Sequence, residues 1–139
     1  MAEIIRLDTG VKEFTINDAV TVRFAPTDMT FIEKVYNALE AMDKKQEAFN
    51  KSIEGVKDAE IFKAARRFDE EARAEINGVF GVDICTPIMG DMNVITLANG
   101  FPAWANILLA IIEQFEGDFA EQKKHSSARL AKYTAKYKR

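Results

Sequence analysis

The chain of 139 residues is long enough for one domain with a hydrophobic core, and its single cysteine, Cys85, excludes an intramolecular disulfide. One cysteine and one histidine also exclude a zinc site built from several such ligands. The net charge of −3 is unevenly spread, because residues 123–139 hold seven of the 19 basic residues and none of the 22 acidic ones. The first residues do not resemble a signal peptide, so we expect a cytoplasmic protein.

The segment 3–25 is the only part of the chain with strand character. Apolar residues alternate there with polar ones, at Phe14, Ile16, Val20, Val22 and Phe24. Asn17-Asp18 lies between the two alternating runs and favours a tight turn, which predicts a β-hairpin. Ile5 and Leu7 predict a third strand, joined to the hairpin by a turn at Thr9-Gly10. Because so small a ribbon is marginally stable alone, we expect it to pack on helices or on another subunit.

A long helix is predicted to follow Pro26, with Thr27 or Asp28 as its N-cap. Its apolar positions step by three and four residues with one polar interruption, through Ile32, Val35, Leu39, Met42, Gln46, Phe49, Ile53 and Val56. This heptad spacing is compatible with a coiled-coil pairing and with an amphipathic helix that lies on the core. Because Ser52 and Gly55 weaken the last turns, we favour the amphipathic helix.

Asp58 is expected to cap a second long helix, whose apolar stripe consists of Ile61, Ala65, Phe68, Ala72, Ile76 and Val79. The opposite face alternates in charge, and pairs such as Asp69 and Arg73 are interpreted as solvated. Residues 82–90 are apolar without helical or strand periodicity and are predicted to form a packed loop. A short helix from Met92 to Ala98 is predicted to follow.

The most apolar stretch runs from Phe101 to Phe119 and is built around Trp104. Pro102 suits the first turn of a helix and no further breaker occurs before Gly117, so one helix is predicted. Its apolar residues point in nearly every direction around the axis. About 12 strongly apolar residues are too few to cross a bilayer, which takes roughly 20, so this helix is predicted to be the buried centre of the fold.

Together these segments predict a mainly α-helical fold of the α+β type, with an N-terminal β-hairpin followed by four to five helices around the central apolar helix. Residues 1–122 are interpreted as one domain, and residues 123–139 as a basic tail that either extends the last helix or is disordered. Tyr133 and Tyr137 lie among the basic residues of this tail and could stack on bases. Because the body is strongly acidic and repels a polyanion, we do not expect nucleic acid as a partner.

The sequence contains little that could support catalysis. The only histidine, His125, lies in the basic tail, so an ordered pair of nucleophile and base is not expected. Cys85 lies in an apolar segment and is interpreted as a small buried residue rather than a reactive thiol. Gly78 and Gly81 follow a helix and have no P-loop lysine. We therefore expect no enzymatic activity, no cofactor and no metal.

Several short segments together resemble the small tail-assembly chaperone-like proteins encoded in the tail modules of long-tailed phages and prophages of Gram-positive bacteria. The layout is similar over residues 12–120. The segments that carry the resemblance are Val22-Arg23-Phe24-Ala25-Pro26-Thr27-Asp28, Phe31-Ile32-Glu33-Lys34-Val35-Tyr36, Glu75-Ile76-Asn77-Gly78-Val79-Phe80-Gly81, Met89-Gly90-Asp91-Met92-Asn93 and a hydrophobic helix that ends in Gln114-Phe115.

The resemblance implies a mainly helical protein without catalytic residues. Such a protein multimerises along the tape-measure protein and keeps it soluble until tail-tube subunits polymerise around it. A chaperone of this kind needs apolar surface for its client and a way to self-associate. The residues interpreted as this surface are Phe14, Ile16, Val20, Val22, Phe24, Ile32, Val35, Leu39, Met42 and Phe49. We expect copies to associate through the free edge of the hairpin into a homo-oligomer.

Two other functions are compatible with the residues. One is a structural component that stays in the assembled tail, virion or injection system. The other is a helical domain that binds a small ligand or has a regulatory role, with the apolar loop 82–90 as a pocket wall. Four methionines suit adaptable packing against a client, although they also suit an ordinary core, namely Met29, Met42, Met89 and Met92.

Overall fold

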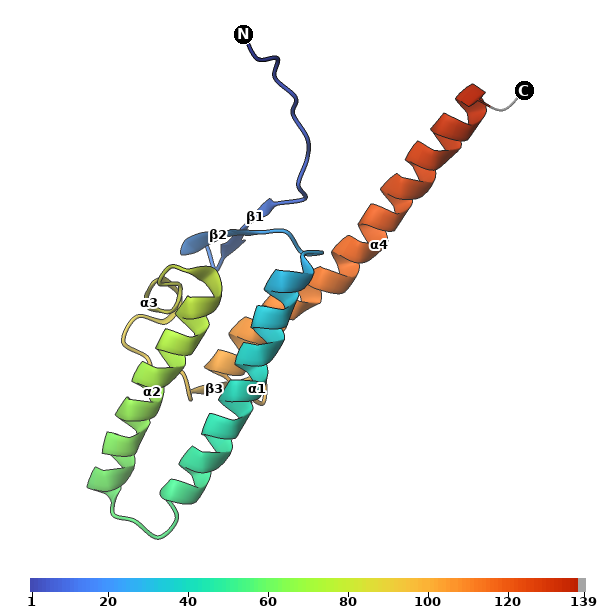
Figure 1. Cartoon of the computed structure of the whole chain (residues 1–139). Coiled ribbons are helices and arrows are strands. Elements are labelled where there is room, and N and C mark those ends of the chain that lie inside the picture. The colour runs from blue at the N-terminus through green and yellow to red at the C-terminus, as the bar shows by residue number, and fades with distance from the viewer. Residues whose placement is uncertain (138–139) are drawn as a thin grey trace.

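The structure, a computed structural model, describes residues 1–137, with side chains for residues 1–128 and 131. Two antiparallel helices, α1 and α2, pack together and α4 lies against them, while a β-hairpin crosses one end (Figure 1). This mainly helical fold with an N-terminal hairpin was predicted from the sequence. In chain order the elements are β1 (Lys12–Ile16), β2 (Val20–Phe24), α1 (Met29–Ser52), α2 (Asp58–Phe80), α3 (Cys85–Met89), β3 (Leu97–Ala98), β4 (Phe101–Pro102) and α4 (Ala103–Tyr137).

The hairpin of β1 and β2 forms where the alternating residues predicted it. The strands pair antiparallel, from Lys12 opposite Phe24 to Ile16 opposite Val20. Asn17 and Asp18 both have a φ of 53°, a left-handed conformation that asparagine and aspartate tolerate well. The predicted third strand is wrong. Residues 1–11 form an extended arm that leads away from the body, with Gly10 in a left-handed conformation and its N–H donating to Asp8 (Figure 1).

An aromatic cluster fixes the hairpin to the helices. The ring of Phe24 stacks on Phe14 and on Phe31 of α1, with ring centroids 4.5 Å apart in both pairs. The same ring meets Phe80 of α2 and Phe115 of α4 edge-on. Since aromatic pairs add to the free energy of burial, this cluster connects the hairpin to all three long helices.

The heptad seam faces the interior of the protein from Ile32 to Phe49, so the interpretation as an amphipathic helix on the core is confirmed. The last seam residue, Val56, lies beyond the end of α1 and is exposed. Asp28 caps α1, and its side chain accepts a hydrogen bond from the Thr30 amide. The polar position of the seam has its own partner, because Gln46 Oε1 accepts a hydrogen bond of 2.9 Å from Trp104 Nε1. Asp58 is the first residue of α2 and not its cap, which is Lys57 without a side-chain hydrogen bond.

The central helix is longer than predicted and begins later. Phe101 and Pro102 pair with β3, so α4 starts at Ala103. It continues through Gly117 to Tyr137, so the described part of the basic tail, residues 123–137, extends the last helix. One glycine costs a helix only about 1 kcal/mol, which the buried turns before Gly117 offset. The side chains of Tyr133 and Tyr137 lie outside the described part of the structure.

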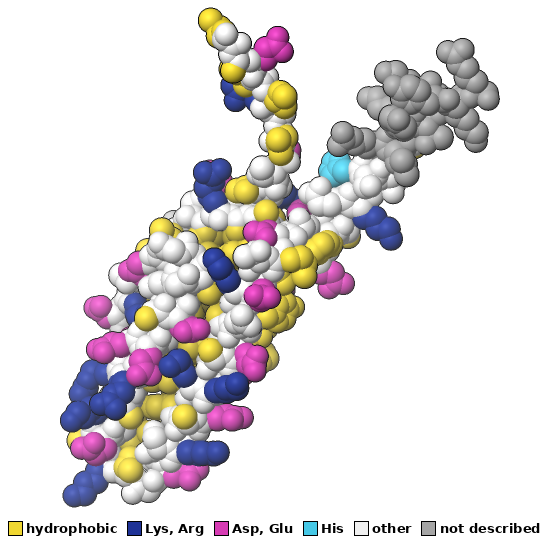
Figure 2. All heavy atoms as spheres, viewed as in Figure 1, with side chains coloured by type: hydrophobic (Ala, Val, Ile, Leu, Met, Phe, Trp, Pro, Cys, Tyr) yellow, Lys and Arg dark blue, Asp and Glu magenta, His cyan; other side chains and the backbone are white. Residues whose placement is uncertain are grey.

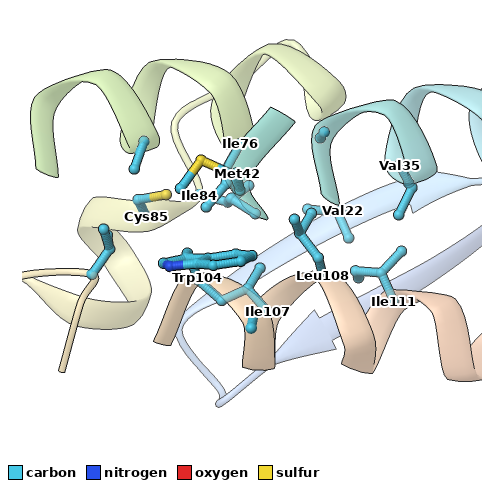
Figure 3. Packing of buried hydrophobic residues seen from close by; sticks show 14 of the residues in the cluster. Val22, Val35, Met42, Ile76, Ile84, Cys85, Trp104, Ile107, Leu108 and Ile111 are labelled. Carbon is cyan, nitrogen blue, oxygen red and sulfur yellow. The ribbon is translucent and has the colours of Figure 1, made fainter. Parts of the chain in front are cut away.

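Trp104 lies at the centre of the core, 2% exposed, as predicted for the central helix. Figure 3 shows its ring beneath Met42 and Ile76 and close to Ile84. Leu108, one turn further along α4, is fully buried. The core therefore joins α1, α2 and α4 to the segment between α2 and α3.

Candidate functional site

An open groove with a volume of about 580 Å³ lies between β1 and α4 and is the main candidate for a binding site. One wall is the end of β1, the other is α3 with the loop behind it, and the floor is the first three turns of α4. The lining residues are mostly apolar. They are Phe14, Thr15, Ile16, Asn17, Ile88, Met89, Met92, Ala103, Asn106, Ile107, Ala110, Ile111 and Gln114.

The floor of the groove follows from the spacing of residues on α4. Ala103, Ile107, Ala110 and Gln114 are separated by four, three and four residues, so they lie on one face of the helix. Because two of these four positions are alanines, the face leaves room between β1 and α3. Asn106 borders the floor, and its Nδ2 donates to Ala98 O at 2.9 Å and to Phe101 O at 3.3 Å, which ties α4 to the β3–β4 turn.

The β1 wall presents backbone as well as side chains. Neighbouring residues of a strand point to opposite faces, yet residues 14–17 all line the groove. The groove therefore meets the edge of β1 and not only its inner face. This edge is unpaired in the described structure, because β1 pairs with β2 alone. An unpaired edge offers N–H and C=O groups to another extended segment.

Asn77 fixes the α3 wall through side-chain hydrogen bonds that the sequence did not reveal. Its Oδ1 accepts from the amides of Ile84 at 2.9 Å and of Cys85 at 3.2 Å, and its Nδ2 donates to Asp83. The hydroxyl and amide of Thr86 hold the pKa of Asp83 below its usual value. Residues 82–90 were predicted to be a loop. They contain α3, because Asn77 accepts from the amides of Ile84 and Cys85 at the start of this short helix.

Asp69 and Arg73 of α2 fix the loop that follows α3, so their interpretation as a solvated pair is wrong. Arg73 Nη2 donates to Gly90 O and to Met92 O, both at 2.7 Å, and Arg73 Nε donates to Asp69 at 3.0 Å. Asp69 Oδ1 accepts from Val94 N at 2.8 Å. The predicted helix from Met92 to Ala98 is also wrong, because these bonds hold the segment in turns that lead into β3.

Most of the residues interpreted as a partner surface lie in the core instead. The buried ones are Val22, Phe24, Ile32, Val35, Met42 and Phe49. They contact other parts of their own chain, so a partner cannot reach them in this structure. Val20 and Leu39 are partly buried and pack against the same core. Of the ten residues predicted as the partner surface, only Phe14 and Ile16 line the groove.

The groove also contains residues that sequence analysis did not single out as binding residues, chiefly Ala103, Ile107, Ala110 and Ile111 on α4. The available signal was their spacing, but α4 is apolar on nearly every side, so spacing alone did not show which side stays open. The segment 82–90, proposed above as a pocket wall in one alternative, does line the groove through Ile88 and Met89.

A second crevice, of about 530 Å³, separates the lower ends of α1 and α2. Its lining mixes apolar residues with charged ones, Lys45, Glu60, Arg67 and Glu71 among them. Lys45 Nζ and Glu71 Oε2 lie 3.6 Å apart across it. Figure 2 shows acidic and basic side chains interspersed along this part of α1 and α2. Charges of both signs at an open surface suit solvent better than an apolar partner, so the groove beside β1 is the better candidate site.

Neither the cysteine nor the histidine stands in the groove. Cys85 is fully buried, and burial raises the pKa of its thiol to about 11, which disfavours the nucleophilic thiolate. His125 is exposed on α4, where its Nε2 lies 3.4 Å from Glu121. Within residues 1–137, no group of three histidine, cysteine or carboxylate side chains could hold a metal ion, and no helix is long and apolar enough to cross a membrane.

Comparison of the chain with protein-family models, with curated proteins and with solved structures finds no match.

Proposed function

We propose that this protein is an assembly chaperone that holds an apolar segment of a client protein in the groove between β1 and α4. The observation that carries the proposal is the groove itself, which is open, mostly apolar and next to an unpaired strand edge. Met89 and Met92 line it, and methionine side chains adapt to partners of varied sequence. A chaperone must release its client unchanged, so it binds the client through reversible apolar contacts, and such a surface provides them.

The resemblance described above supplies the client. It implies the tape-measure protein of a phage tail, with the tail-tube protein as the partner that later displaces the chaperone. The groove floor from Ala103 to Gln114 extends for about 16 Å along α4, which matches about three turns of a client helix. A long helical client offers apolar faces of this length repeatedly, so several copies of the protein can bind along it.

Co-expression with a tape-measure fragment tests this proposal. Ala110 is exposed in the middle of the groove floor, so Ala110→Glu places a charge against the client without removing a core contact. Ala120→Glu is the matched control, because it makes the same change at an exposed position of the same helix outside the groove. We expect the wild type and Ala120→Glu to keep the fragment soluble and Ala110→Glu to lose it. Equal solubilisation by both variants would remove the groove from the proposal.

A small apolar ligand is the second candidate, because the volume of about 580 Å³ falls within the range of small-molecule sites. The two candidates differ in what stabilises the isolated protein. A ligand that binds only the folded state raises the melting temperature, and the stabilisation grows with the logarithm of its concentration relative to Kd. A thermal-shift screen with fatty acids and aromatic compounds, repeated on Ala110→Glu, would show an Ala110-dependent increase if this second function is correct.

A further inference from the structure

The arm, residues 1–11, carries large aliphatic side chains into solvent. Ile4, Ile5 and Leu7 are 78%, 88% and 77% exposed. Figure 2 shows hydrophobic side chains along the arm at a distance from the body. Water disfavours apolar surface of this size on an extended segment, so a surface that covers these side chains stabilises the arm.

The groove continues beyond Phe14 and Gln114 into a depression of about 280 Å³, which we call the acidic extension. Its lining residues are Lys12, Phe14, Pro26, Glu113, Gln114, Gly117, Asp118 and Glu121. Asp118 is only 6% exposed, and one of its carboxylate oxygens pairs with Lys12 Nζ. The other, Oδ2, is buried without a hydrogen-bond partner among the described residues. Because an unpaired buried acceptor is unfavourable, this end of the groove favours a cationic donor.

We infer that the arm of a second copy of this chain occupies the groove as a strand antiparallel to β1. β1 runs from the acidic extension at Lys12 to the groove at Ile16. Because residues two apart in a strand share a face, an antiparallel arm places Ile4 over the apolar groove and Arg6 toward Glu113, Asp118 and Glu121. Backbone groups of the arm pair with the free edge of β1, as in strand addition. The arm therefore matches the groove in apolar surface, in charge and in backbone hydrogen-bonding groups.

The direction of the arm selects a second copy over the arm's own chain. Figure 1 shows residues 1–11 leading away from the body that carries their own groove. To enter that groove, residues 8–11 must reverse direction and lose the hydrogen bond from Gly10 N to Asp8 Oδ1. A neighbouring copy needs no such rearrangement. When each arm enters the groove of the next copy, the contact is head-to-tail and produces a ring or an open chain.

Arm and client would then compete for one groove. This competition rests on the proposed function, whereas arm exchange does not. Without a client, the arms cover the grooves and link the copies to one another. A client segment displaces the arms from the copies it binds, so arm removal is expected to strengthen client binding.

Disulfide cross-linking tests arm exchange directly. Ile4→Cys and Ala110→Cys are made as separate proteins, mixed in equal amounts and oxidised gently. We expect a mixed dimer that forms at least several times faster than with Ala120→Cys as the partner, the matched control on the same helix. Cys85 is buried, so the wild type serves as an unreactive blank. Equal rates with both partners would overturn the inference, and so would a disulfide within single chains of the Ile4→Cys/Ala110→Cys double variant at high dilution.

Sedimentation over a range of concentrations tests the same contact without cysteines. Burial of one isoleucine side chain corresponds to about tenfold or more in an association constant. We therefore expect Ile4→Asp to weaken self-association by at least tenfold, and Arg6→Glu to weaken it most at low salt. Thr9→Asp adds the same charge to the arm outside the docked segment and should change little. A wild type that stays monomeric up to several hundred micromolar would refute arm exchange.

The two proposals fail separately. If the wild type is monomeric but Ala110→Glu still abolishes client solubilisation, arm exchange is wrong and the chaperone function stands. If arms cross-link to grooves but no tape-measure fragment is solubilised, the chaperone function is wrong and arm exchange stands.

Discussion

Replacement of Arg73 by methionine separates two interpretations of the charged face of α2. As a solvated pair four residues apart, Arg73 and Asp69 would contribute about 0.5 kcal/mol or less to the free energy of unfolding. In the structure their side chains are only 17% and 20% exposed, and Arg73 also donates to the carbonyl oxygens of Gly90 and Met92. Methionine keeps much of the aliphatic stem and removes all three hydrogen bonds.

The expected loss follows from these hydrogen bonds. A hydrogen bond to a charged group contributes about 1.5–3 kcal/mol, and we take the lower value because water can replace Arg73 at the exposed carbonyls. Two such bonds and the weakened contact with Asp69 amount to about 2–4 kcal/mol, a large share of a typical total of 5–15 kcal/mol. The loss for Arg73→Lys should be smaller than the loss for Arg73→Met, because an ammonium keeps the charge but lacks the planar guanidinium that donates several hydrogen bonds at once.

Urea unfolding followed by the fluorescence of Trp104 measures this loss, since Trp104 is 2% exposed and becomes solvated on unfolding. Arg66→Met is the matched control, because Arg66 is an exposed arginine on the same helix. It should change the free energy of unfolding by less than about 0.5 kcal/mol. If Arg73→Met also lowers the free energy of unfolding by less than about 0.5 kcal/mol, with the same slope against urea concentration, the hydrogen bonds of Arg73 do not stabilise the loop behind α3.

The other predictions concern the core. Leu108→Ala should cost about 2–5 kcal/mol, because Leu108 is fully buried between helices that cannot readily close the cavity, and thermal unfolding measures it. Native Cys85 should resist alkylation at pH 8 and react once the protein unfolds; rapid labelling of the native protein would contradict its burial. Because burial raises the pKa of the Cys85 thiol from its ordinary value of 9.0 to about 11, Cys85 contributes stability that is present below pH 9 and is lost between about pH 9 and 11.

The sequence allowed prediction of those elements whose cause is local. The turn at Asn17-Asp18 lies between two alternating runs, and Asp28 caps the helix that immediately follows it. The spacing of the α1 seam is a property of α1 alone. In each case the residues that determine the conformation lie within a few positions of it, so no knowledge of the tertiary structure was needed.

The segment between α2 and α4 could not be predicted because distant residues determine it. Asp69 holds Val94, which is 25 positions away, and Arg73 holds Met92, which is 19 away. In the sequence this carboxylate and guanidinium are four residues apart on a charged helix, the pattern of a solvated pair. Arg73 contacts the loop behind α3, which contributes Met92 to the groove, so the sequence did not reveal this wall of the groove for the same reason.

The length of α4 has a consequence for how this helix melts. Its first turns are buried around Trp104 and Leu108, whereas residues 119–128 are exposed. An isolated helix of the length of residues 119–137 is marginal in water, because its first turn is costly to nucleate. Here the buried turns supply that nucleus, and each further residue needs only propagation. The part of α4 that follows Asp118 should therefore unwind gradually from Tyr137 toward Asp118, with amide exchange slowing residue by residue, while the core stays intact.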